Sequence, residues 1–185
     1  MTSLILRVDG GSRGNPGPAG YGVVVQDESG QVIARLKQSV GRQTNNFAEY
    51  QGLLAALRYA RENGAERVQV FADSQLLVRQ MQGRYAVRSE NLLPLFEEAR
   101  RLAKSFRQFG IGHVYREENA EADQLANEAM DEAMGKPPAG KSAAPAAPVE
   151  PLPDEIIAEV RQGRIWLPKP LPWPDGTRMV IRRCR

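Results

Sequence analysis

The chain has 185 residues, enough for one domain plus an appendage, and its single histidine and single cysteine exclude zinc sites and Cys/His nucleophile pairs. Its net charge of +3 is unevenly divided, because residues 1–134 hold 16 Lys and Arg against 17 Asp and Glu, whereas residues 135–185 hold 9 against 5. A polyanionic ligand would therefore be attracted mainly by the C-terminal part of the chain.

The sequence also indicates where in the cell the protein is expected to be located. No apolar run is long enough to span a bilayer, and the N-terminus lacks the basic segment and apolar stretch of a signal peptide. The lone cysteine, Cys184, cannot form an internal disulfide, which suits a reducing environment. We therefore expect a cytoplasmic protein that makes no membrane contact.

Three segments with alternating apolar residues open the chain, at residues 3–9, 20–26 and 32–40. Short turn-forming links that contain Gly17, Gly20 and Ser29-Gly30 separate them. This pattern predicts three strands in an antiparallel meander.

Helical and strand patterns alternate from there to residue 134. Helices are predicted at 46–63, 74–82, 90–106 and 119–134, and strands at 67–72 and 110–115. Asn63-Gly64 suits a helix C-terminus, and Ser74 and Asn119 suit helix N-caps. The order βββαβααβα predicts an α/β fold with one mixed five-stranded sheet flanked by helices.

The remainder of the chain changes composition. Residues 135–153 are rich in Pro and Ala and are expected to form an extended linker. Beyond them, 154–162 suits a short helix, while 164–167 and 177–181 suit a hairpin, too little for an independent core. We therefore expect a domain over 1–134, a linker over 135–153 and a small basic extension over 154–185.

Four acids stand beside apolar residues at strand ends or on inward helix faces: Asp9, Glu49, Asp73 and Asp123. They could be four unrelated caps and surface acids. If they instead form one cluster, they repel one another and raise their own pKa values. Magnesium relieves such repulsion because it takes oxygen ligands and keeps waters for a phosphate substrate.

The segments that carry these acids resemble the four motifs of type 1 ribonuclease H, in that family's order and at similar spacings across residues 3–134. They read Asp9-Gly10-Gly11-Ser12-Arg13-Gly14-Asn15-Pro16-Gly17, Thr44-Asn45-Asn46-x-x-Glu49, Asp73-Ser74-Gln75 and Ala122-Asp123-x-Leu125-Ala126. The resemblance implies a ribonuclease H-like fold and an endonuclease that cuts the RNA strand of an RNA/DNA hybrid, leaving 5′-phosphate and 3′-hydroxyl ends. It implies that the four acids bind two Mg²⁺ ions, or Mn²⁺.

The resemblance also implies substrate-binding positions. In the family, the equivalents of Gly10, Gly11, Ser12, Asn45, Asn46 and Gln75 contact sugar hydroxyls and minor-groove edges, and a 2′-hydroxyl distinguishes RNA from DNA. Asn15, Thr44 and Ser74 match positions that hold a phosphate of the DNA strand. Alternatively, Asn46 is only a helix N-cap.

Two departures from the family pattern concern product release and substrate grip. The loop before the last helix reads Tyr115-Arg116-Glu117-Glu118-Asn119, without the histidine found in many members, so it resembles a histidine-less branch in which Arg116 or Glu117 could take over part of that role. His113 falls in the preceding strand and is expected to be structural. The segment 83–89 is too short for the basic protrusion that grips the hybrid in several members.

The C-terminal extension could supply the missing positive charge. Its cations are Lys169, Arg178, Arg182, Arg183 and Arg185, and Trp166 and Trp173 could stack on bases. Alternatively, the extension only packs on the domain or on another copy of the chain. Its protein partners are unknown.

Two other functions are alternatives to the ribonuclease. Transposase-like nucleases and proofreading exonucleases carry acids on a similar sheet, but lack the Asp9-Gly10-Gly11 loop combined with Thr44-Asn45-Asn46. A hybrid-binding module without activity would be indicated by loss of one acid, and all four are present.

Overall fold

Five strands of the N-terminal part form one sheet in the order β3-β2-β1-β4-β5. The strands are β1 (Ser3–Ser12), β2 (Gly17–Gln26), β3 (Val32–Gln43), β4 (Arg67–Ala72) and β5 (Gln108–His113). The pairs β1–β2 and β2–β3 are antiparallel, whereas β1–β4 and β4–β5 are parallel. This computed structural model, which describes residues 2–135, 159–161 and 164–166, confirms the mixed five-stranded sheet.

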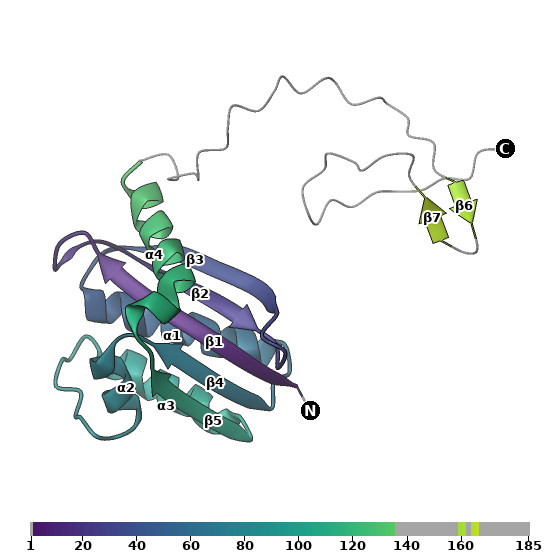
Figure 1. Ribbon diagram of the computed structural model, residues 1–185. Helices are drawn as coiled ribbons and strands as arrows, with labels where there is room; N and C mark the ends of the chain where they lie inside the picture. Colours follow the sequence, from purple (N-terminus) through teal and green to yellow (C-terminus); the bar gives the residue numbers. More distant parts are fainter. Residues whose placement is uncertain (1, 136–158, 162–163, 167–185) are drawn as a thin grey trace. The chain divides into compact units, whose positions relative to one another are not determined.

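Helices cover both faces of this sheet. They are α1 (Asn45–Glu62), α2 (Gln75–Met81), α3 (Leu93–Ser105), the short 3₁₀ helix η1 (Arg116–Asn119) and α4 (Ala120–Ala133). Figure 1 shows α4 crossing the front of the sheet over β1 and β2, with α1 and α3 behind it. The strand β2 is therefore buried on both sides along most of its length.

The main core lies between the sheet and α1. Strand residues alternate between the two faces, so every second side chain of β1 and β4 points into this core. The buried side chains are Leu4, Leu6 and Val8 of β1, Val68, Val70 and Ala72 of β4, and Leu53, Leu54 and Leu57 of α1.

Helix boundaries confirm some of the predicted caps and correct others. Ser74 is the N-cap of α2 and accepts a hydrogen bond from the Leu77 amide at 3.3 Å. Thr44, not Asn46, caps α1, because its hydroxyl accepts from the Phe47 amide at 3.3 Å. Asn119 occupies the N-cap position of α4, as predicted, but its side chain makes no capping hydrogen bond, so the predicted capping interaction is wrong.

The chain divides into two compact units, Met1–Lys141 and Ser142–Arg185. In the second unit, β6 (Glu159–Arg161) pairs antiparallel with β7 (Arg164–Trp166). The helix predicted over 154–162 is therefore wrong at 159–161, where the β-branched residue Val160 pairs with Ile165 in a strand. The predicted linker from 136 onward and the predicted strand 177–181 lie outside the described residues.

No helix in the described part of the chain combines the length and apolarity needed to cross a membrane.

Candidate active site

The sheet brings Asp9 and Asp73 side by side. The last registered pair between the parallel strands β1 and β4 is Val8 with Ala72. Asp9 is the next residue of β1 and Asp73 directly follows the end of β4, at the point where this ladder ends. The carboxylates thus meet where the strands separate, which is where parallel sheets commonly bind ligands.

Glu49 reaches the same point because α1 lies directly on β1. A Cβ atom added to Gly10 would lie 2.4 Å from the backbone carbon of Ala48 and from the backbone nitrogen of Glu49. Only glycine permits this approach, and it places the second turn of α1 against the residue after Asp9. The Ser74 hydroxyl then donates a hydrogen bond to Oε2 of Glu49 at 2.7 Å.

Asp123 comes from the other face of the sheet, on α4. This helix packs closely on β2, because a Cβ atom at Gly22 would lie 2.2 Å from the Ala122 carbonyl oxygen. Gly22 is also the register partner of Asp9. A single pair of sheet residues thus brings the helix carrying Asp123 to the strand carrying Asp9.

Burial and neighbouring charges raise the pKa of two of these acids. Burial raises the pKa of Asp9 to about 8, and the negative charges of Asp73 and Asp123 add to that rise. Burial also raises the pKa of Glu49 to about 7; the Ser74 hydrogen bond opposes this rise, and the charge of Asp73 adds to it. The cluster therefore favours either protons or a cation.

Asp123 already has a cationic partner. Nη2 of Arg116, in η1, lies 2.5 Å from Oδ1 of Asp123, and Nδ2 of Asn127 donates to Oδ2 of Asp123 at 3.1 Å. The Arg116 side chain is 71% exposed, so nothing buried holds it in place. An incoming cation can therefore replace it without disturbing the core.

These acids line one polar cleft of about 300 Å³. Its walls are Asp9, Gly10, Gly11, Ser12, Arg13, Asn45, Glu49, Asp73, Ser74, Arg116, Asp123, Asn127 and Met130. All four predicted acids therefore converge, together with predicted residues Gly10, Gly11, Ser12, Asn45, Ser74 and Arg116.

The glycine-rich loop is fastened to the start of α1. Oδ1 of Asn45 accepts from the Ser12 amide at 2.6 Å and from the Ser12 hydroxyl at 2.7 Å, while Oδ1 of Asn15 accepts from the Asn45 amide at 3.3 Å. Because Oδ1 of Asn45 accepts both hydrogen bonds from Ser12, the Nδ2 group of Asn45 can donate to a partner outside the loop.

Five predicted residues do not line this cleft. Asn15 supports Asn45, Thr44 caps α1, and Asn46 lies partly exposed in the first turn of α1. Gln75 and Glu117 are exposed, at the start of α2 and within η1.

Sequence reasoning missed three residues of the cleft, namely Arg13, Asn127 and Met130. Asn127 and Met130 follow Asp123 at helical spacings of four and seven, so they share its face of α4, and this spacing was the available signal. Nη2 of Arg13 lies 3.2 Å from Oδ1 of Asp131, which attaches the glycine-rich loop to α4.

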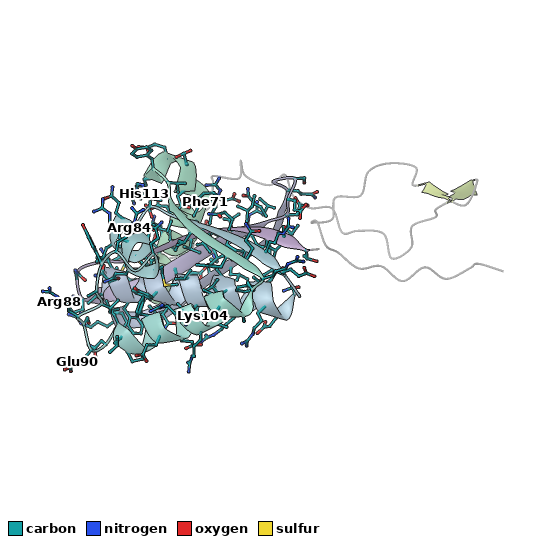
Figure 2. All side chains as sticks on the ribbon, turned by 90° about the horizontal axis from the view of Figure 1, so that it is seen from below. Phe71, Arg84, Arg88, Glu90, Lys104 and His113 are labelled. Atoms are coloured by element: carbon teal, nitrogen blue, oxygen red, sulfur yellow. The ribbon has the colours of Figure 1, made fainter. Side chains whose placement is uncertain are left out.

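The single histidine is not part of the cleft. His113 is the last residue of β5, and its ring lies edge-on to that of Tyr115 with 5.8 Å between centroids. Figure 2 shows His113 near Phe71, the register partner of Gly112, and shows Arg84 and Arg88 on the short loop between α2 and α3.

The donor set suits hard divalent cations, because all four acids offer oxygen ligands and together carry excess negative charge. Within the described residues, no three His, Cys, Asp or Glu side chains are already gathered around a common point as a finished metal centre.

Comparisons with known proteins point to one family. A family model described as "Reverse transcriptase-like" matches residues 7–129. The "Bifunctional protein Rv2228c" of Mycobacterium tuberculosis is 50% identical over 131 residues, which are 70% of this chain and 36% of that protein. The "Ribonuclease HI" of Halobacterium salinarum is 42% identical over 125 residues, 68% of this chain and 63% of that protein.

A solved structure extends the likeness to three dimensions. LC11-RNase H1, determined in complex with an RNA/DNA hybrid, matches with a TM-score of 0.67 and 41% identity, covering 71% of this chain and 99% of that one. The chain thus spans about a third of the Rv2228c protein and nearly the whole of the solved ribonuclease chain.

Proposed function

This chain belongs to the ribonuclease H-like family, and on that premise we propose that it is an endoribonuclease that hydrolyses the RNA strand of RNA/DNA hybrids. The products would carry 5′-phosphate and 3′-hydroxyl ends. The observation that carries the proposal is the convergence of Asp9, Glu49, Asp73 and Asp123, from four separate segments, on one polar cleft beside the glycine-rich loop.

We assign the four acids as ligands for two Mg²⁺ ions, with Mn²⁺ as an alternative. When bound, such ions activate a water and stabilise the leaving 3′-oxygen of the cleaved phosphodiester. The chain supports this chemistry by orienting its carboxylates: Ser74 holds Glu49 at 2.7 Å, and Asn127 holds Asp123 at 3.1 Å. The raised pKa values of Asp9 and Glu49 fit a site that needs cations to ionise fully.

Recognition of the hybrid is assigned to the rim of the cleft. The Asn45 Nδ2 group is available to donate to a sugar hydroxyl or a base edge, because the Asn45 oxygen is occupied by its bonds to Ser12. We assign the same kind of contact to Gly10, Gly11, Asn46 and Gln75. Ser12 would contact sugar hydroxyls with the rest of the glycine-rich loop, and Asn15, Thr44 and Ser74 would hold a phosphate of the DNA strand. Arg116 and Glu117 would form the product-release loop.

We assign catalysis to residues 1–134, with 135–153 as linker and 154–185 as a basic extension. A cytoplasmic location is proposed because a single cysteine suits a reducing compartment.

The test uses the full chain with end-labelled RNA/DNA, RNA/RNA, DNA/DNA and single-stranded RNA, each with Mg²⁺ and with EDTA. Only the RNA strand of the hybrid should be cut, and only with the metal. Phosphatase treatment should remove the 5′-phosphate of the downstream product and thereby change its migration. Undiminished cleavage in EDTA, or equal cleavage of all four substrates, would contradict the proposal.

A further inference from the structure

Asn119 is one of only two buried polar side chains in the described part of the chain; the other is Gln80. Its Nδ2 group donates to the Val8 carbonyl oxygen at 2.9 Å. Its Oδ1 atom is buried and has no hydrogen-bond partner among the described residues.

The stability of the fold does not explain an asparagine at this place. A buried polar atom without a partner costs free energy, and an apolar side chain of similar volume would avoid that cost. Such exceptions to good packing are found at functional sites. The hydrogen bond to the Val8 carbonyl is therefore the feature of Asn119 that calls for a functional explanation.

The position of that hydrogen bond in the fold suits a functional role. Val8 is the residue before Asp9 and belongs to the last registered pair between β1 and β4. Asn119 lies at the junction of η1 and α4, three residues after Arg116 and four before Asp123. One hydrogen bond thus joins the strand that carries Asp9 to the first turn of the helix that carries Asp123.

A second bond runs beside it. Nη1 of Arg7 donates to the Glu118 carbonyl oxygen at 2.8 Å, and its guanidinium lies 5.4 Å from the centre of the Phe71 ring. Residues 7 and 8 are therefore bonded to residues 118 and 119, and each bond spans 111 positions in the sequence.

Other attachments of α4 run to β2 and β3. At its first turn, Gly22 lies against Ala122 and Arg35 pairs with Glu121 at 2.6 Å. Farther along, Gly20 lies against Ala129, and Lys37 pairs with Glu128 at 3.0 Å and with Glu132 at 2.6 Å. These contacts hold the body of α4 on β2 and β3. None of these contacts bonds the first turn of α4 to β1 itself, whereas the Asn119 hydrogen bond joins the start of α4 directly to the strand that carries Asp9.

We propose that Asn119 is a positioning residue that, through its bond to the Val8 carbonyl, holds Asp123 at the spacing from Asp9 that a shared divalent cation requires. The inference rests on the proposed function, because it concerns ion binding by two of the assigned ligands. Arg7 strengthens the same connection from the surface.

The test substitutes Asn119→Leu in the full chain, which keeps the volume and removes the donor. Mn²⁺ binding is measured by titration calorimetry without nucleic acid, and kcat, KM and Tm are measured in parallel. We expect Mn²⁺ affinity to fall by roughly 3- to 10-fold, as for loss of one hydrogen bond, and kcat to fall by at least as much. KM for the hybrid should stay near its native value. The change in Tm should be small, because loss of the bond to the Val8 carbonyl is offset by removal of the unpaired Oδ1 atom.

The matched control is Gln80→Leu, the other buried amide. Oε1 of Gln80 accepts from the Tyr50 hydroxyl at 2.8 Å, so this variant leaves a buried hydroxyl unpaired and should lower Tm. Mn²⁺ affinity and kcat should remain native. If Asn119→Leu does not fold, Asn119→Ala and the milder Arg7→Met take its place, and both should weaken Mn²⁺ binding.

The outcomes separate the two hypotheses. If the native chain neither binds Mn²⁺ nor cuts the hybrid, the proposed function fails. If the native chain does both and the Asn119 variants bind Mn²⁺ with native affinity and turn over normally, the positioning role alone is overturned. A loss of kcat that only parallels a loss of Tm, as in an unstable protein, would also overturn it.

Discussion

At the scale of single residues, the cleft is defined by negative charges that have little to neutralise them. Burial and the charges of two further carboxylates raise the pKa of Asp9. For Glu49, whose pKa burial also raises, the hydrogen bond from the Ser74 hydroxyl is the one opposing interaction. Arg116 neutralises Asp123 from an exposed position. The folded protein therefore carries electrostatic strain at this one point, which removal of charge or addition of cations should release.

Asp73→Asn tests this strain directly. The substitution keeps the shape of the side chain and removes a charge that raises the pKa of Asp9. We expect turnover to fall by at least roughly 100-fold, with hybrid binding retained and Tm unchanged or higher. The control is Asp27→Asn in the exposed turn after β2, where Oδ1 accepts from the Ser29 amide at 2.8 Å, and turnover there should stay native. An unfolded Asp73→Asn protein would make Asp73 a structural residue.

The same pKa values predict how stability depends on pH. Asp9 and Glu49 bind protons more tightly in the folded chain, with pKa values of about 8 and about 7 against ordinary values of 3.8 and 4.5. Their contribution to folding stability is thus fully present below about pH 4 and is lost as pH rises through about 7 to 8. In EDTA, Tm should fall between about pH 5 and pH 8.

Saturating Mg²⁺ should flatten that profile, because bound cations favour the ionised carboxylates. Scanning calorimetry at several pH values, with and without the metal, measures both effects. A Tm that rises over this interval in EDTA would show that the two acids are not protonated in the folded chain.

At the scale of elements, the decisive contact is that between β2 and α4. Glycines on β2 remove the side chains that would separate strand and helix, and Gly22 faces Ala122, Leu125 and Ala126. Lys37 then pairs with two glutamates of α4 from the neighbouring strand. The position of Asp123 consequently depends on how closely a whole helix packs on the sheet.

Gly22→Ala should disturb this packing. The new methyl group would lie 2.2 Å from the Ala122 carbonyl oxygen and 2.6 Å from the Leu125 Cβ atom, so α4 must move away from β2. We expect a loss of about 1–3 kcal/mol in the free energy of unfolding, measured by urea titration, together with reduced turnover.

Gly112→Ala on β5 is the matched control. Its methyl group would meet the Phe71 ring at 3.5 Å, an ordinary contact, so stability should change by less than about 1 kcal/mol. Equal losses in the two variants would indicate a general intolerance of alanine in these strands and would not support the close packing of α4.

The elements were predictable from local patterns, and most of the site was predictable from its motifs. The order of strands and helices follows from apolar periodicity, and the acids Asp9 and Asp123 stand out beside their apolar neighbours. The roles of Asn119 and Asn127 could not be predicted, because a polar residue near a helix start suits a cap as well as a buried contact. Asn119 and Val8 are 111 positions apart in the sequence, and only the folded structure brings them into contact.

At the scale of the whole molecule, charge and chemistry occupy different parts of the sequence. Residues 1–134, which include every acid of the cleft, hold 16 Lys and Arg against 17 Asp and Glu, whereas residues 135–185 hold 9 against 5. The loop between α2 and α3 contributes only Arg84 and Arg88, both labelled in Figure 2. Attraction of a hybrid should therefore depend on the C-terminal extension.

Truncation after Met134 tests that dependence. The five-stranded sheet and α4 are complete at Ala133, so the shortened chain should fold and keep its chemistry. Its KM should rise, and the salt dependence of binding should become shallower by about one unit for each lost phosphate contact. Unchanged KM and salt slope would show that the extension does not bind nucleic acid, and unfolding would show that it braces the domain.

The four acids also set a condition on biosynthesis. They occupy positions 9, 49, 73 and 123, so the last acid is translated 114 residues after the first. At about 5–20 residues per second, a ribosome needs roughly 6 to 23 seconds to add it. Until α4 has been made and has packed on β2, a nascent chain holds three carboxylates and no complete site. A premature stop anywhere before codon 123 should accordingly release a product that lacks the fourth acid of the cleft.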